Sequence, residues 1–375
     1  MKNLSLILGL MIAASPAFAS RARLEALGEG KNGSYYINDS RNIFLNPAQI
    51  VKHKKKLWLE LGGEPGNTTR DLAEAPRGQG GFSNTFGDYT YGVYLNQTSE
   101  RAINIASQAN ALGGAFIAAD SQAELTFAGE GGMNWGISLF YAGNNTKSAV
   151  PLEKTASLFG TRLGIESGSL AVYSTIGIMS SSKVLNATAD EIKGKMSVDL
   201  AATYGMDNWT WFGKFATFGS DVALTSVTTE VRTSSFGGGF GYTKEWSKTA
   251  TMFTRLEADY AKQTVTGLSD TVWWNVPLVI GAEAQALSWL AVRGSIAQSL
   301  IGQTYSEPTR NNYPGTTTVA AGLGATFGDV NIDGLISLGT TTTTDIPGFG
   351  TAPTTAGNFG FGNNMLSRVA LTYNF

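Results

Sequence analysis

The chain ends in Arg368-Val369-Ala370-Leu371-Thr372-Tyr373-Asn374-Phe375, and this stretch decides the predicted fold. Apolar side chains at every second position, up to the terminal phenylalanine, give the period-two pattern of a β-strand with two different faces. In lipid, each unpaired backbone group costs several kcal/mol, so a last strand of this kind must pair with the first one. The ending therefore predicts a closed barrel.

The same eight residues resemble the C-terminal strand by which outer-membrane barrels are recognised, with a closing phenylalanine and an aromatic residue two positions before it. The resemblance implies an assembly signal at Val369, Leu371, Tyr373 and Phe375. It also implies that the barrel-assembly machinery is a partner and that the chain is located in the outer membrane of a Gram-negative bacterium.

Alternating segments of about ten residues recur upstream, for example at 134–142, 195–206, 251–262 and 329–338. Short links and long links rich in Ser, Thr, Asn, Gly and Pro follow one another in turn. Transmembrane barrels have this arrangement, with short turns on the periplasmic side and long loops outside, whereas a Greek-key sandwich does not require it. The predicted fold class is an all-β, transmembrane, antiparallel β-barrel.

We predict fourteen strands, with sixteen as the alternative if the stretch around Leu125–Ala128 adds strands. The predicted strands are 57–61, 87–96, 133–142, 155–166, 169–179, 195–206, 209–218, 232–243, 250–262, 273–286, 289–299, 316–327, 329–339 and 366–375. Four tryptophans, Trp135, Trp209, Trp246 and Trp289, lie beside predicted short turns. Such positions suit an aromatic girdle at one membrane interface.

Composition narrows the function classes. The 27 basic and 29 acidic side chains nearly balance, which argues against a nucleic-acid partner. The sequence has no cysteine and one histidine, His53, so little remains for thiol, metal or triad chemistry. We predict no catalytic residues, no metal and no cofactor, and expect that the protein is not an enzyme.

Three segments lie outside the strand pattern. Residues 1–19 read as a signal peptide, with Lys2, an apolar stretch and an Ala17-Phe18-Ala19 cleavage site. Residues 20–56 form a periplasmic, hatch-like segment that ends in a lysine-rich run, which either contacts lipid phosphates or is a solvated flank; His53 in this run is expected at the surface. Residues 97–132 are predicted to be a periplasmic-side insertion with a short helix, capped by Thr98 or Ser99.

The barrel spans 57–375 in this interpretation, and Glu60 with ten further charged residues would point inward. Acids and bases are nearly equal in number, so no strong ion selectivity is predicted, and Glu257 with Asp259 is expected to line the lumen rather than to catalyse. The ten predicted lumen residues are Arg162, Asp199, Lys214, Arg255, Glu257, Asp259, Glu283, Arg293, Asp333 and Arg368.

The run Gly237-Gly238-Gly239-Phe240-Gly241 suggests an interface on the outer face, with Phe236 and Phe240 flanking Gly238. Small residues permit the close packing on which association in lipid depends. The alternative is that the glycine only relieves bending of the barrel wall.

Residues 23–28, 41–50 and 57–62 together resemble the N-terminal frame of the porin-like, lipid-trapping major outer-membrane protein of predatory bacteria (PopA-type). That resemblance implies a ring-shaped homo-oligomer that encloses membrane lipid. Asn46-Pro47-Ala48 also resembles the hatch of fatty-acid-transporter barrels. The alternatives left open are a passive diffusion porin for small solutes and a transporter of hydrophobic substrates.

Overall fold

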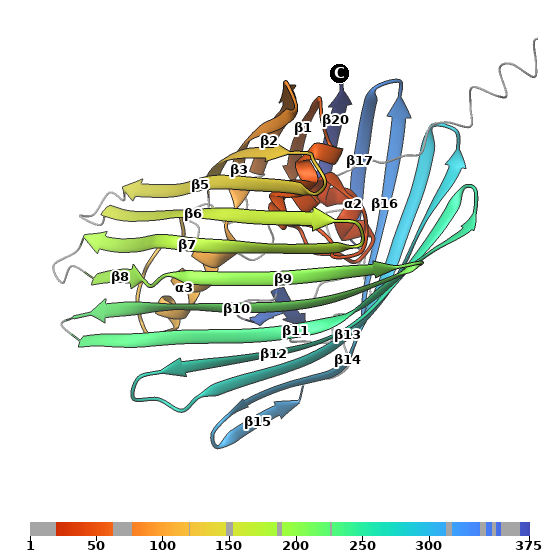
Figure 1. The fold of residues 1–375 in the computed structure, drawn as a ribbon. Helices are drawn as coiled ribbons and strands as arrows, with labels where there is room; N and C mark the ends of the chain where they lie inside the picture. The colour runs from red at the N-terminus through yellow and green to blue at the C-terminus, as the bar shows by residue number, and fades with distance from the viewer. Residues whose placement is uncertain are drawn as a thin grey trace, which may run out of the picture.

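Strands make up most of the chain, and the computed structural model joins them into one continuous antiparallel sheet (Figure 1). The structure describes residues 20–62, 77–119, 121–147, 153–185, 190–225, 227–312, 317–337, 343–346, 350–353 and 368–375. The predicted signal peptide at 1–19 lies outside these residues. Within the described part of the chain, no helix is long and apolar enough to cross a membrane.

The wall has sixteen strand positions, the alternative count from the sequence, rather than fourteen. The first eight are β1 (Lys56–Gly62), β2 (Arg77–Phe86), β3 (Tyr89–Thr98), β4 (Ser121–Gly129), β5 (Asn134–Lys147), β6 (Glu153–Ser167), β7 (Leu170–Leu185), and β8 (Asp190–Gly194) with β9 (Ser197–Met206). β8 and β9 share one position because both pair with β7 and β10.

The second eight are β10 (Trp209–Leu224), β11 (Val227–Ser247), β12 (Ala250–Val265), β13 (Thr271–Leu287), β14 (Leu290–Ser306), β15 (Thr309–Asn312) with β16 (Thr317–Phe327), β17 (Val330–Ser337) and β20 (Arg368–Asn374). β15 and β16 both pair with β14 and so share one position. A separate hairpin consists of β18 (Thr343–Ile346) and β19 (Gly350–Pro353).

The last strand closes the barrel, as the C-terminal alternation predicts. β20 pairs with β17 on one side and with β1 on the other, antiparallel to both. The amide of Phe375 donates to the carbonyl of Lys55 at 3.0 Å, which extends this pairing to the end of the chain. Among the described strands, none is left as an edge of the wall, so their backbone groups facing lipid are paired.

The two faces of the wall differ in the way that a lipid environment requires. Outward side chains are large and apolar along nearly every strand, for example Leu59, Leu139 and Ile296, each about half exposed. Inward positions carry small, polar or charged residues together with buried large apolar ones such as Phe140, Leu158 and Tyr173. The four predicted girdle tryptophans are all exposed and lie beside the short turns. This is a transmembrane barrel of the type found in the outer membrane of Gram-negative bacteria.

The strands predicted from the sequence omit β2 and β4. The omission of β2 changes the end of the barrel at which a helix is predicted to lie. β2, which the prediction omits, reverses the chain once more before residue 99, so α3 (Glu100–Ala111) lies at the long-loop end. The prediction that 97–132 is an insertion on the periplasmic side is therefore wrong, because the helix in this range lies at the opposite, long-loop end. The same range also contains β4, so it is not wholly an insertion.

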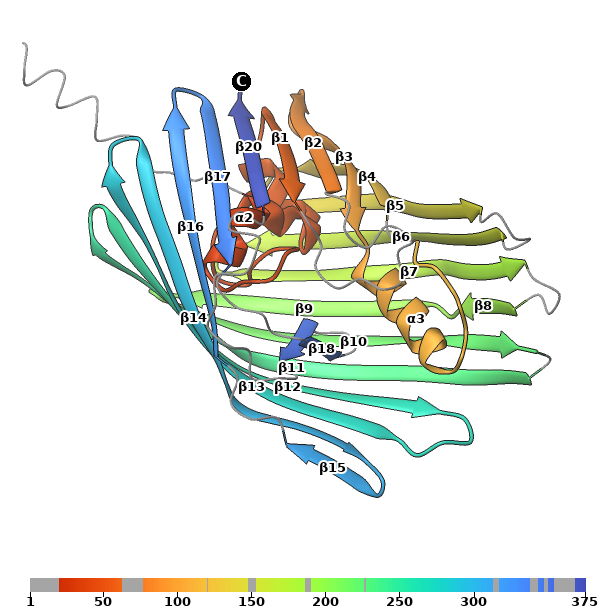
Figure 2. The same ribbon diagram turned by 180° about the vertical axis from the view of Figure 1, so that it is seen from behind.

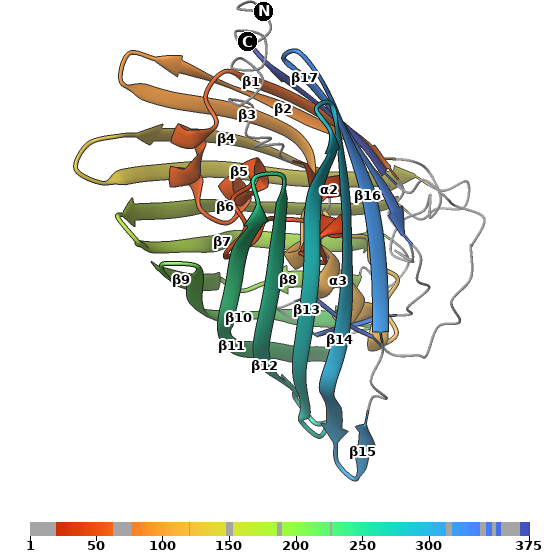
Figure 3. The same cartoon turned by 90° about the vertical axis from the view of Figure 1, so that its right-hand side faces the viewer.

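In the described part of the chain, residues 20–53 and the helix α3 lie inside the ring of strands (Figures 2 and 3). At the short-turn end, α2 (Arg21–Ala26) contacts β14, β16, β17 and β20, and the 3-10 helix η2 (Pro47–Lys52) contacts β3 to β6. Another 3-10 helix, η1 (Ser40–Phe44), lies beside η2. The lumen is thus occupied from both ends, and its contents are the candidate functional site.

Candidate functional site

Residues 20–53, called the plug below, contain three short helices, α2, η1 and η2, and each of them begins at a polar capping residue. The Ser20 hydroxyl accepts from the Arg23 amide at 3.0 Å, the Asp39 carboxylate from the Arg41 amide at 3.0 Å, and the Asn46 side chain from the Ala48 amide at 3.0 Å. Such caps satisfy N–H groups that a helix start leaves unpaired. The plug therefore needs few residues to form a defined shape.

Glycines on the inner face of the wall make room for the plug. A Cβ atom at Gly92 would come within 2.7 Å of Ile50, and one at Gly322 within 2.7 Å of Ala26. At Gly136 a Cβ would meet the backbone of Pro47 and Ala48, again closer than real Cβ contacts. The wall backbone and the plug are thus complementary in shape.

Buried ion pairs attach the plug to the wall. Arg23 donates to Glu283 of β13 and to Asp39, both at 2.9 Å, and Arg41 pairs with Glu60 of β1 at 3.4 Å. Three of the predicted lumen residues complete this group. Arg368 pairs with Glu25 at 3.2 Å, the Ser20 hydroxyl donates to Asp333 at 2.8 Å, and Arg293 bridges Glu283 and Asp333.

A second buried group lies between β10, β12 and the plug. Lys214 pairs with Glu257 and, at 3.1 Å, with Asp259, while Arg255 pairs with Glu257 at 3.1 Å and with Glu29 of the plug at 3.4 Å. Because each carboxylate has a cationic neighbour, this arrangement is a charge-compensated network.

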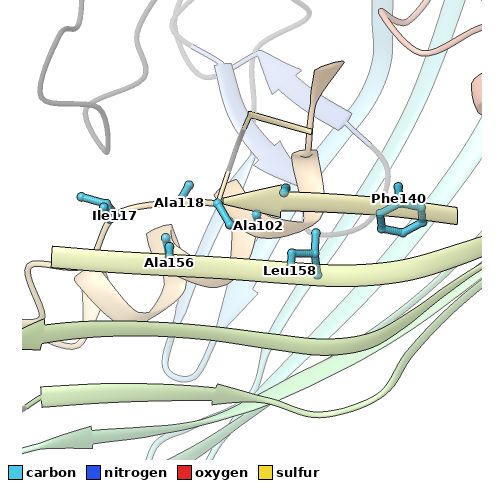
Figure 4. Packing of buried hydrophobic residues seen from close by; sticks show 9 residues of the cluster. Ala102, Ile117, Ala118, Phe140, Ala156 and Leu158 are labelled. Atoms are coloured by element: carbon cyan, nitrogen blue, oxygen red, sulfur yellow. The ribbon is translucent and has the colours of Figure 1, made fainter. Parts of the chain in front are cut away.

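The remaining two predicted lumen residues lie near α3. Asp199 pairs with Arg101 of α3, and Arg162 pairs with Glu124 of β4. Glu124 is not among the predicted lumen residues because β4 is not among the predicted strands. The helix packs through Ala102 and Ala106 on a patch of β5 and β6 that includes Phe140, Ala156 and Leu158 (Figure 4). The same buried face continues through Ile105 and Ala109, which pack on inward side chains of β7, β8, β10 and β11.

A cavity of about 280 Å³ lies between the plug and α3. Aromatic and aliphatic side chains supply much of its lining, namely Tyr35, Phe44, Leu45, Phe140, Leu158 and Tyr173. The charged side chains that line it are the paired ones described above, together with Lys31 and Glu100, which pair at 3.5 Å. The cavity therefore offers apolar surface and compensated charge to a solute.

Burial shifts the pKa of several groups in the plug, among them Asp39 and His53. It raises the pKa of Asp39 to about 6, against the opposing effect of Arg23. It lowers the pKa of His53 to about 3, with Lys56 and Lys52 adding to the effect. The expectation that His53 lies at the surface is wrong, because the residue is only 6% exposed and its backbone carbonyl accepts from the Ser83 hydroxyl of β2.

The lysine-rich run is paired with acidic side chains at the short turns. Lys52 pairs with Glu166, and Lys54 pairs with Glu130 at 2.5 Å. Both lysine side chains stay more than a third exposed. These contacts make the run part of the plug's attachment, a role that neither sequence alternative included.

The predicted interface residues lie on the outer face. Phe236 and Phe240 flank Gly238, and Gly238 belongs to a row of small residues that crosses four strands, Ala202, Gly213, Gly238 and Ala258. Large apolar side chains border this row on both sides. They are Leu200, Phe215, Phe236 and Tyr260 toward the long loops, and Tyr204, Trp211, Phe240 and Leu256 toward the short turns.

The partners of the lumen charges were missed in the sequence. Arg21, Arg23, Glu25, Glu29 and Arg41 all lie in the segment that has no strand pattern. One signal for them was present, since eleven inward charges need water or opposite charges, and the nearest unassigned charged residues are those of 20–41. Arg101 gave no comparable signal, because its helix was placed at the other end.

Comparisons with known proteins give similar solved structures only. No family model matches the chain, and no curated protein matches it. The solved structures include the Pseudomonas putida toluene transporter TodX, at 12% identity and a TM-score of 0.37 over 95% of this chain and 99% of that one. A Pseudomonas aeruginosa FadL homologue matches at 10% identity and a TM-score of 0.41 over 95% of this chain and 98% of that one.

A valine at Gly136 should displace the plug, because its side chain would occupy the space of Pro47 and Ala48. Overpacking of this kind costs about 1–3 kcal/mol. The expected result is faster trypsin cleavage within 21–53 of the folded barrel, read by mass spectrometry. Gly213→Val is the matched control, since a Cβ there meets nothing within 4 Å. Equal cleavage of both variants would contradict the proposed fit.

Acidification should weaken the seating of His53. The folded chain keeps the ring neutral down to a pKa of about 3, whereas the unfolded chain binds a proton near the usual pKa of about 6.5. Stability should therefore fall as the pH drops from about 6.5 toward 3, by up to about 1.4 kcal/mol per pH unit. Urea unfolding in lipid vesicles at pH 7 and 5 measures this loss. The pH effect should shrink in His53→Gln; an unchanged effect would assign the loss to other groups.

Proposed function

We propose that this chain is a gated barrel that transfers small, uncharged, partly apolar solutes across the outer membrane. The observation that carries the proposal is the plug, which occupies the lumen and is held there by buried ion pairs, with a solute-sized cavity above it. This is the hydrophobic-substrate alternative from the sequence rather than the open diffusion porin.

The plug argues against a permanently open pore. Its contacts reach the wall on two opposite sides, through η2 to β3–β6 and through the Glu29–Arg255 pair to β12. The pairs Arg23–Glu283 and Arg41–Glu60 are nearly inaccessible to solvent, so an ion cannot pass between them without breaking them. Passage through this lumen therefore requires movement of the plug.

The cavity chemistry supports the solute class. Rings of Tyr35, Tyr173 and Phe140 offer contact to an apolar body, and the volume of about 280 Å³ is close to the lower limit of ligand pockets, about 300 Å³. A charged solute would compete with existing ion pairs, whereas an uncharged one leaves them intact. We propose no catalytic role and no cofactor, with outer-membrane lipids and the assembly machinery as the partners of the wall.

Releasing the plug should open the barrel to ions. In Arg23→Met/Arg41→Met, Glu283, Asp39 and Glu60 lose charged partners, and breaking a buried pair costs about 3–5 kcal/mol. In planar bilayers the unmodified protein should show little conductance, and the double variant should show frequent openings. In liposome-swelling assays, the double variant should admit a small uncharged aromatic solute faster than a sugar of equal size.

Lys147→Met is the control, because Lys147 is 75% exposed and pairs with Glu153 at 3.9 Å at the long-loop end. Its conductance should equal that of the unmodified protein. A large steady conductance of the unmodified protein would instead support the diffusion porin. A silent double variant, with its plug shown by proteolysis to be released, would contradict gating by the plug.

A second candidate is the ring-shaped, lipid-enclosing homo-oligomer, favoured by the row of small residues on the outer face. Gly213→Leu tests it better than a change at Gly238, where even a Cβ would lie 3.1 Å from the Phe212 carbonyl. If protomers pack on this row, Gly213→Leu should dissociate the oligomer in detergent and leave folded monomers, as size-exclusion chromatography with light scattering would show. An intact oligomer would remove the row from the interface.

A further inference from the structure

α3 is held by few strong contacts. Its buried face consists of three alanines and Ile105, and alanine side chains bury little apolar area. The helix starts at the Ser99 cap and is followed by Gly113, whose φ of 97° and open surroundings suit a pivot. Packing alone therefore gives this helix a weak hold on the wall.

Two adjacent residues of opposite charge extend from the helix start in different directions. Glu100 pairs with Lys31 of the plug at 3.5 Å, and Arg101 pairs with Asp199 of β9. Successive helical residues point about 100° apart, so the two side chains reach different partners. Ser99, Glu100 and Arg101 all line the cavity, which places both ion pairs at its margin.

Lys31 is itself fixed by the attachment of the plug. Its carbonyl accepts from the Arg41 guanidinium at 2.8 Å, and Arg41 also pairs with Glu60 and donates to Gln97 of β3 at 3.0 Å. β3 leads directly into α3. The plug loop and the helix start are therefore connected through Arg41 as well as through the ion pair.

We propose that α3 is a second gate, at the long-loop end of the cavity, and that Lys31–Glu100 latches it to the plug. With the latch closed, the plug and the start of α3 narrow the two exits of the cavity. When Glu100 leaves Lys31, the helix start moves from the cavity margin and opens it toward the long loops, while the plug keeps its wall contacts. This regulation rests on the proposed function, because it assigns the entry step of the same cavity.

A charge exchange tests the latch, and the absence of cysteine from the chain allows a single reporter. Ser197→Cys places a thiol on a cavity-lining, 5% exposed position. In intact cells, an uncharged, membrane-impermeant maleimide reports access from the long-loop side. Glu100→Lys and Lys31→Glu should each raise the labelling rate about two- to fivefold, the range expected for a partly exposed ion pair. The double exchange should return it to the original rate.

The double exchange separates latching from damage to the helix. Lysine at 100 opposes the helix dipole in both Glu100→Lys and the exchanged protein, so restoration by Lys31→Glu requires the pair itself. Lys147→Glu should leave labelling unchanged. Unchanged labelling in Glu100→Lys, or no restoration in the double exchange, would overturn the proposal.

The latch proposal and the proposal of gating by the plug are contradicted by different results. If the plug-release variant stays silent in bilayers while the labelling pattern holds, gating by the plug is wrong and the latch stands. If that variant conducts while Glu100→Lys leaves the labelling rate unchanged, the latch proposal is wrong and the plug remains the gate.

Discussion

Charged side chains that point into a narrow barrel must find either water or an opposite charge, and the arrangement of this lumen follows from that requirement. On the paired strands, the residues directly opposite Glu60 and Arg368 are Ala370 and Gly62, which carry no charge. The plug provides Arg41 and Glu25 for these two residues. Its seat, its caps and the wall glycines follow from the same need, because the charges pair only when the plug backbone comes close.

The wall obeys a separate rule, closure of all backbone hydrogen bonds in lipid, and this rule is visible in the sequence. The alternation around Leu371 and Tyr373 identified the closing strand because side chains on one face meet only lipid. The sequence does not predict β2, because glycines occupy its outward positions 78 and 80 and so leave no apolar alternation there. One missed strand reverses every later direction until another is missed, which is why α3 was assigned to the wrong end.

The interior was predictable only in part, for a physical reason. Period two reports which residues face inward, so all ten proposed lumen residues could be named from it. Pairing depends on contacts between distant segments, such as Arg23 with Glu283, and no local pattern records these. His53 illustrates the same limit, since its burial comes from β2 packing over it rather than from its lysine-rich neighbours.

The plug has a mechanical consequence besides occlusion. η2 touches β3–β6, and Glu29 of the plug pairs with Arg255 of β12, which lies roughly half the circumference away in the sixteen-stranded ring. The N-terminal segment is thus a cross-brace, and its ion pairs fix the distance between opposite walls. A barrel without this brace would be free to flatten, and its cross-section would then be set by the lateral pressure of the surrounding bilayer.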